Sequence, residues 1–232
     1  MKTLQMQKAR KLTYFAILTA LVVVLQFTAS AIPVGSVTLN FVLVPVIVCG
    51  ILLGVFYGAL LGFIVGVIIL LAGVIGMDGF TNVLFAEYPV AITLVCVLKT
   101  TLAGAVSALV FNAAGKKHRY LGTFLSAVSA PVVNTGTFVL SMLFLQNALA
   151  EKGFIDGGKN AFISICVGLV GINFVFELLL NVVFAPAVYR VITIIDKKAV
   201  SDGEAENASD GDADVKTESG AKNNGDDNGE NV

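Results

Sequence analysis

The sequence predicts an all-α integral membrane protein, a bundle of six transmembrane helices followed by a disordered acidic C-terminal tail. Of the 232 residues, 56% are hydrophobic and only 13% are charged, and the mean hydropathy is +0.88. Soluble domains need far more polar surface than this composition can supply. The apolar segments have the length of helices and lack the roughly ten-residue alternation of outer-membrane barrel strands. These observations together favour a helical membrane bundle.

Charge divides the chain at residue 198. Residues 1–198 carry 13 Lys and Arg against 6 Asp and Glu, a net charge of +7, whereas residues 199–232 carry 2 Lys against 10 Asp and Glu, a net charge of −8. The second segment has almost no large apolar residue, so it cannot bury a core and is predicted to be disordered. We therefore expect a membrane domain over residues 1–198 and a solvated tail over residues 199–232.

The first expected span covers residues 12–31 and follows a basic amino terminus with four Lys or Arg residues. A basic stretch before an apolar run also resembles a secretory signal, for which residues 29–31 would supply a cleavage site. The further spans favour a retained helix instead. Ala16 and Ala20 lie four residues apart on one face, as a small-xxx-small pair that allows a close helix contact.

The next apolar stretch, residues 41–73, carries a series of glycines at a spacing of four. A single helix of this length would measure about 50 Å, against a hydrocarbon core of about 30 Å. We therefore predict a hinge at residues 54–58 and two spans, 41–54 and 57–73; one long tilted helix is the alternative. Because glycine lowers helix propensity, five glycines on one face favour close helix packing. The series consists of Gly50, Gly54, Gly58, Gly62 and Gly66.

Three further spans are expected over residues 90–114, 120–145 and 161–184. The segments between them are a polar loop at 77–90, a short basic turn at 115–119 and a second polar loop at 146–160. With six spans, the basic amino terminus, the basic turn and the cluster at Arg190, Lys197 and Lys198 all fall on one side. By the positive-inside rule, we expect both termini in the cytoplasm of a cell whose plasma membrane the chain crosses.

Two ionisable residues lie inside expected spans, Lys99 in the fourth and Glu177 in the sixth. Ionisable groups are costly within a bilayer, which makes both residues candidates for a functional site. Asn173 and Asn181 extend Glu177 into a polar stripe at a spacing of four residues.

The fifth span contributes a polar, bendable segment in which Asn134 follows Pro131. A proline frees a backbone carbonyl, and such a segment is tolerated where it lines a cavity. Counted from the external helix ends, Asn134 and Asn173 both lie about 18 Å deep, so they can face one another. Two readings stay open: these residues bind a ligand, or Lys99 pairs with Glu177 and the asparagines bond between helices without any ligand.

The sequence offers no sign of catalytic chemistry. Cys49, Cys96 and Cys166 lie in apolar runs, as expected of buried free thiols, and His118 is the sole histidine. There is no P-loop, nucleophile elbow or HExxH motif, so we predict no enzyme, no cofactor, no metal site and no nucleic-acid partner. No inverted repeat is detectable, which weakens the interpretation as a secondary transporter.

The order and spacing of several loose motifs resemble the substrate-binding S components of energy-coupling factor (ECF) vitamin transporters. The motifs are the basic amino terminus leading into Ala16 and Ala20, the glycine hairpin GILLGVFYGALLG, and the segments at 88–89, 98–104 and 131–138. The resemblance covers about residues 8–195, and the acidic tail has no counterpart in the family pattern.

The resemblance implies that the chain binds a vitamin or related micronutrient near the external side and passes it to an ATP-driven importer. It implies three partners, a transmembrane coupling subunit and two ABC-type ATPases, and it assigns the Ala16 and Ala20 face to the coupling subunit. The candidate substrate-binding residues are Lys99, Asn134, Asn173 and Glu177 in the spans, with Asn82, Glu87 and Tyr88 in the second external loop.

The substrate itself is not readable from the residues. The chain has no Trp, unlike the Trp-rich thiamin-binding members, so we expect a substrate other than thiamin. Lys99 suits an anionic group such as a carboxylate, which favours pantothenate- or niacin-like ligands. The rival functions are a structural or assembly membrane protein, in which Lys99 and Glu177 only pack helices, and a stand-alone channel or carrier.

Overall fold

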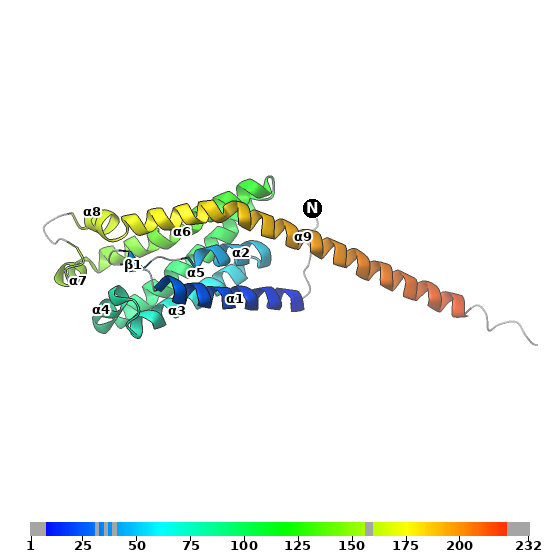
Figure 1. Ribbon diagram of the computed structural model, residues 1–232, viewed down its shortest axis with the longest axis horizontal. Coiled ribbons are helices and arrows are strands. Elements are labelled where there is room, and N and C mark those ends of the chain that lie inside the picture. The colour runs from blue at the N-terminus through cyan, green and yellow to red at the C-terminus, as the bar shows by residue number, and fades with distance from the viewer. Residues whose placement is uncertain (1–7, 31–32, 35–36, 39–40, 156–159, 222–232) are drawn as a thin grey trace, which may run out of the picture. The chain divides into compact units, whose positions relative to one another are not determined.

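The computed structural model describes residues 8–30, 33–34, 37–38, 41–155 and 160–221, with side chains over 8–28, 41–155 and 160–198. The chain divides into two compact units, Gln7–Ile192 and a second made of Met1–Met6 with Thr193–Val232. The first unit contains the helices discussed below, which are labelled in Figure 1. The second unit contains the continuation of the last helix to Ala221.

Five of the described helices are long and apolar enough to cross a membrane. They are α1 (Lys8–Ser30), α3 (Val55–Val74), α5 (Pro89–Ala114), α6 (Arg119–Phe144) and the part of α9 (Gly171–Ala221) that ends at Lys198. The fold class is therefore confirmed as a helical membrane bundle. The count of six spans is not confirmed, because α2 (Leu43–Leu53) has only 11 residues and measures about 16 Å.

The break between α2 and α3 is a single residue, Gly54, within the hinge expected at 54–58. Gly54 has φ +101°, a backbone conformation that residues with a side chain rarely adopt. A methyl group added at Gly58 would come within 2.8 Å of the Gly50 α-carbon, so the two helices meet backbone to backbone beside the break. The stretch 41–73 is therefore two helices, and the alternative of one long tilted helix is wrong.

α3 and α5 pack together along the glycine series. A methyl group added at four of the glycines would come closer than 3.0 Å to atoms of α5, whereas Gly54 has no neighbour within 4 Å. The α5 residues on this seam are also small and also four apart, so each helix presents a flat strip to the other. On α3, Gly58 lies beside Gly104, Gly62 beside Thr100 and Gly66 beside Cys96; Gly50 of α2 continues the contact with α5 beside Ala108.

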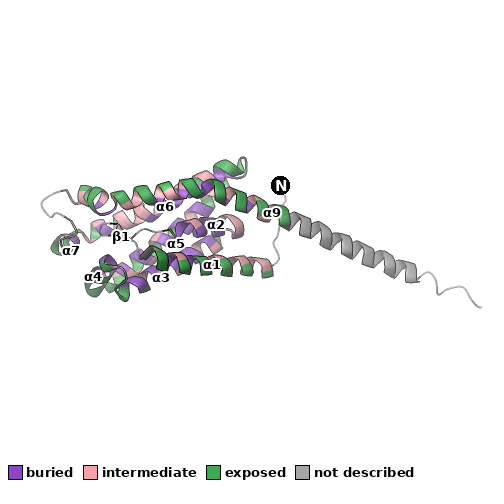
Figure 2. Cartoon of the chain, viewed as in Figure 1, coloured by how far each residue is buried: buried purple, intermediate pink, exposed green. Residues whose placement is uncertain are grey.

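α6 packs on the other side of α5 and completes the core with α2. The Ser126 hydroxyl of α6 donates to the Ser107 carbonyl oxygen of α5 at 2.7 Å, a buried contact between the helices. Leu43 and Ile47 of α2 pack against Ala103 and Ala130 of the two longer helices. Figure 2 shows buried residues gathered on α2, α3 and α5, while α1 and α9 are mostly half-buried or exposed.

Several boundaries differ from the sequence prediction. The two expected polar loops contain short helices, α4 (Gly79–Glu87) and α7 (Gln146–Glu151), each of which buries apolar side chains. The sixth span, expected at 161–184, is built from α8 (Ala161–Ile163), a π-helix η1 (Ser164–Leu169) and α9, and α9 passes through Pro186 without ending. Two short strands, β1 (Pro33–Val34) and β2 (Val37–Thr38), pair antiparallel before α2.

The predicted disorder of residues 199–232 is not confirmed. α9 continues to Ala221, and residues 222–232 lie outside the described part of the chain. The physical reason is that adding residues to an existing helix avoids the cost of nucleation, and the segment includes good helix formers such as Ala and Glu.

Candidate functional site

The carboxylate of Glu177 lies at the centre of a polar cluster between α6 and α9. Glu177 is 1% exposed, although it lies six residues inside a helix of the membrane domain. Its Oε1 accepts a hydrogen bond from Asn134 Nδ2 at 3.1 Å, and its Oε2 accepts one from Thr135 Oγ1 at 3.3 Å. Asn181 Nδ2 donates to the Glu177 backbone carbonyl at 2.7 Å. Two neutral side chains therefore supply hydrogen-bond donors to a carboxylate buried within the membrane domain.

α6 places Asn134 one turn after Pro131. The proline lies within the helix, which stays unbroken on both sides. Because proline has no N–H and its ring meets the preceding turn, α6 is free to bend at this point. Asn134 itself is 5% exposed. Asn134 was expected to face Asn173; among the described residues its hydrogen-bond partner is Glu177 instead.

Lys99 reaches the same region from α5 without pairing with Glu177. Its Nζ lies 5.0 Å from the centroid of the Phe138 ring on α6, a cation–π contact. Lys99 is within electrostatic range of Glu177, yet no ion pair joins the two side chains in the described part of the molecule. The structure thus holds the two opposite charges apart, each against its own partners on α6.

The Phe138 ring that Lys99 contacts is one of three aromatic rings in a row. The ring centroids of Phe80 and Phe138 are 5.9 Å apart, and those of Phe80 and Phe154 are 4.8 Å apart. Phe80 belongs to α4 and Phe154 follows α7, so the two short helices missed by the sequence analysis supply an apolar cover beside the polar cluster. Aromatic groups with a few convergent polar groups are typical of small-molecule sites.

The cluster also contains hydrogen-bonding capacity that no protein group uses. The side-chain oxygens of Asn134, Asn173 and Asn181 are buried and have no partner among the described residues. The Asn134 amide nitrogen faces the Glu177 carboxylate, as suits a group whose oxygens accept, and the amide oxygen is turned away from it. Unused buried acceptors are uncommon and call for an explanation.

The candidate residues of the second loop have other partners. Asn82 Nδ2 donates to the Gly73 carbonyl at 3.0 Å, which ties α4 to the end of α3. Glu87 forms an ion pair with Lys152, and this hydrogen-bonded partner raises the pKa of the exposed lysine. Tyr88 is 38% exposed at the end of α4. None of the three has a described hydrogen bond to the Glu177 cluster.

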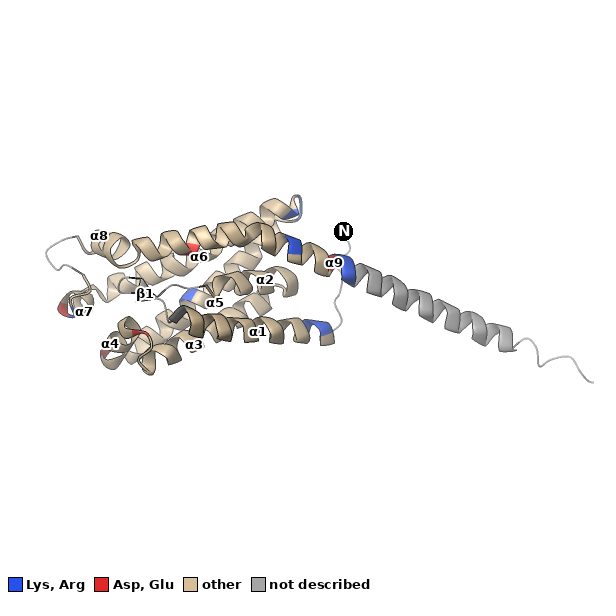
Figure 3. Ribbon diagram, viewed as in Figure 1, with Lys and Arg blue, Asp and Glu red and all other residues tan. Residues whose placement is uncertain are grey.

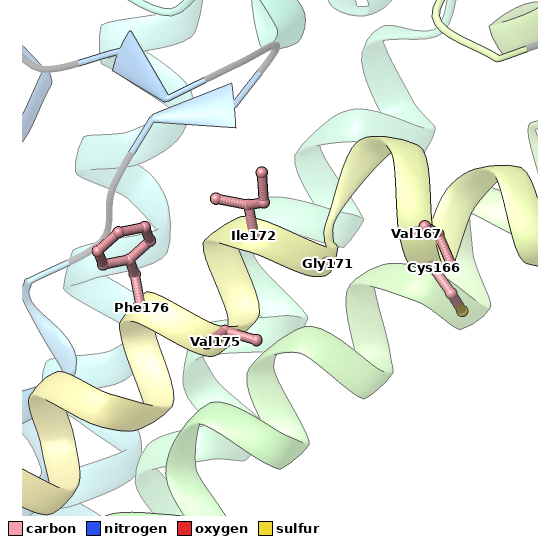
Figure 4. Close-up of a pocket in the computed structure, with 6 residues that line it drawn as sticks. All are labelled: Cys166, Val167, Gly171, Ile172, Val175 and Phe176. Atoms are coloured by element: carbon pink, nitrogen blue, oxygen red, sulfur yellow. The ribbon is translucent and has the colours of Figure 1, made fainter.

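Sequence analysis also missed the π-helix η1, which enters α9 just before the cluster. The Val170 N–H donates to the Ile165 carbonyl at 3.0 Å, the pattern of a wider turn. A methyl group at Gly171 would come within 2.9 Å of the Cys166 carbonyl oxygen, so a glycine here is the one sequence signal. A pocket of about 380 Å³ lies at this junction. The residues that line it, drawn in Figure 4, are Cys166, Val167, Gly171, Ile172, Val175 and Phe176.

α1 presents the alanine pair on its open face. Ala16 and Ala20 are both exposed, whereas Phe15 turns the other way and stacks on Tyr57 of α3 at 5.6 Å between ring centroids. The small-residue face is therefore available to a further helix.

The family described as the substrate-specific component of ECF transporters matches residues 10–189, which contain the whole polar cluster. The chain belongs to this family. An ECF substrate-specific component is a transporter subunit and not an enzyme, and membership implies a complex with a coupling subunit and ATPases. Comparisons with curated proteins and with solved structures gave no match.

Proposed function

We propose that this substrate-specific component captures a vitamin or related micronutrient on the external face of the plasma membrane, for ATP-driven uptake. The observation that carries the proposal is the Glu177 cluster between α6 and α9, with Lys99 of α5 beside it. It combines a buried carboxylate, buried amide oxygens without a partner among the described residues, and a lysine that contacts an aromatic ring instead of a described carboxylate. Such groups are costly in a bilayer, and those that occur there commonly belong to a substrate or ion pathway.

The proposed orientation places both termini in the cytoplasm, with α2 counted as a sixth, short span. The support is the charge distribution drawn in Figure 3, in which α1 begins in basic residues and the turn between α5 and α6 is also basic. The acidic residues Asp78, Glu87 and Glu151 belong to α4, α7 and their flanks. The positive-inside rule assigns the basic end to the cytoplasm.

The test of the site is the double variant Lys99→Met with Glu177→Leu. Small molecules released from the purified full chain are identified by mass spectrometry, and the variant is compared with Leu98→Met plus Leu179→Met, two exposed positions on the same helices. We expect the wild type and the control to release the same solute and the double variant to lose it. A helix-packing pair would tolerate removal of both charges, so retention of the solute at full occupancy would refute the assignment.

The test of the partners uses the exposed face of α1. Ala16→Trp or Ala20→Trp should block assembly with the coupling subunit and the two ATPases in co-purification, because a large side chain keeps the helices apart. Solute binding should survive, since the site lies on α5, α6 and α9. Loss of both properties would indicate misfolding. A structural protein or stand-alone carrier would bring down no ATPase from the start.

A further inference from the structure

The side chains of Lys99 and Glu177 contact one face of α6, one helical turn apart; Glu177 is buried and Lys99 is half-buried. Asn134, which holds Glu177, and Phe138, which holds Lys99, are four residues apart and so share a face. Their separation along the helix axis is about 6 Å. Lys99 of α5 and Glu177 of α9 therefore contact the same face of α6 at positions one helical turn apart.

Neither charge is neutralised by the other. A direct ion pair would be the simplest way to place both charged side chains within the membrane. Each side chain instead contacts neutral or aromatic groups of α6. An uncompensated buried charge is strongly unfavourable. A ligand with both a negative group and an N–H donor would supply each of the two side chains with the complementary partner that it lacks among the described residues.

The side chains around Glu177 also favour a ligand that donates hydrogen bonds. Asn134 bonds the Glu177 carboxylate and Asn181 bonds the Glu177 backbone carbonyl, and the buried side-chain oxygens of both have no partner among the described residues. The groups around Glu177 are mostly hydrogen-bond acceptors, so a ligand there would have to supply N–H donors. Lys99 is a donor with a positive charge, so a ligand there would have to supply an anion.

We infer that the substrate is a small zwitterion, or an equivalent ampholyte, whose amine or N–H group meets Glu177 and whose carboxylate meets Lys99. The inference rests on the proposed function and narrows it, because Lys99 alone would accept any small anion. Complementary charge at both ends also gives specificity, since a molecule with one charge leaves the opposite charge of the protein unpaired.

The experiment uses the full chain in lipid nanodiscs, freed of solute by dialysis, and linear amino acids of graded length. Glycine, β-alanine, γ-aminobutyrate and ε-aminocaproate are compared with butyrate and n-butylamine by thermal stabilisation at neutral pH. We expect one of the amino acids to bind at least about tenfold more tightly than either singly charged compound, since each charged contact is worth about a factor of ten or more.

Two variants test which protein residue binds each end of the amino acid. Lys99→Met should remove the advantage of the amino acid over n-butylamine, and Glu177→Gln should remove its advantage over butyrate. The wild-type ranking tests the inference even where a variant fails to fold. Equal binding of the singly charged compounds, or no binding of any amino acid, overturns it.

The two proposals fail in different ways. A released solute with a single charge, lost from the Lys99 and Glu177 double variant, would overturn the zwitterion inference and leave the proposed function standing. A solute retained by the double variant would overturn the site itself.

Discussion

At Glu177, two neutral donors occupy the places that a counter-ion would take. Asn134 is the stronger of the two by geometry, because it reaches both carboxylate oxygens, at 3.1 and 3.4 Å, while Thr135 reaches one. The sequence predicted that Asn134 and the stripe on α9 belong together, since depth in the membrane can be counted from helix ends. It could not predict that Lys99 stacks on Phe138, because rotation of α5 against α6 is set by tertiary packing.

Asn134→Leu removes the donor at nearly constant volume and leaves the Glu177 carboxylate with one weaker partner. We expect the free energy of unfolding in detergent to fall by about 1–3 kcal/mol, the cost of an unsatisfied buried group. Val132→Leu, at a 48% exposed position on the same helix, is the control and should change little. Equal stability of the two variants would mean that this hydrogen bond contributes nothing to the fold.

At the level of helices, the seam between α3 and α5 is built from two strips of small residues. The glycine series that runs from α2 into α3 was visible in the sequence because five identical residues at one spacing stand out. The matching strip on α5 was not, since it mixes Cys96, Thr100, Gly104 and Ala108, and only packing reveals that they share a role. The helices α4 and α7 were missed for a related reason, because polar residues outnumber the few apolar ones that they bury.

The seam predicts opposite outcomes for the same substitution at two helical glycines. Gly62→Ala places a methyl group against the Thr100 backbone, where nothing flexible can move aside, so we expect a loss of about 1–3 kcal/mol. Gly136→Ala on α6 meets nothing within 4 Å and should be neutral or stabilising by up to about 1 kcal/mol, through helix propensity. Unfolding in detergent measures both. A Gly62→Ala protein as stable as Gly136→Ala would contradict the close approach.

For the whole molecule, the sequence was sufficient to predict the class and most spans but not their exact number. Hydropathy and the positive-inside rule depend only on which residues a segment contains, so both can be evaluated from the sequence alone. α2 is short because it begins only at Leu43 and ends at the backbone turn of Gly54. Neither boundary can be predicted from amino-acid composition.

The proposed orientation predicts which side each turn faces. With the native cysteines replaced, a cysteine at Lys117 should react with a membrane-impermeant maleimide only after the cell is opened. A cysteine at Gly79 should react in intact cells. Both residues are exposed, so a lack of reaction would not come from burial. A reversed pattern would overturn the orientation and, with it, the placement of the substrate entrance on the outside.

The contact of Lys99 with Phe138 has a consequence for biogenesis. When α5 leaves the translocon, Glu177 has not yet been synthesised, so a cation that needed this partner would enter the lipid alone, at an insertion cost of about 2.5–3.5 kcal/mol. Phe138 lies on α6, the helix made next, and α5 and α6 are joined by a short basic turn. We therefore expect α5 and α6 to enter the bilayer as a pair. A nascent chain stopped after residue 145 should insert both helices, and Phe138→Ala should reduce insertion of that truncated chain.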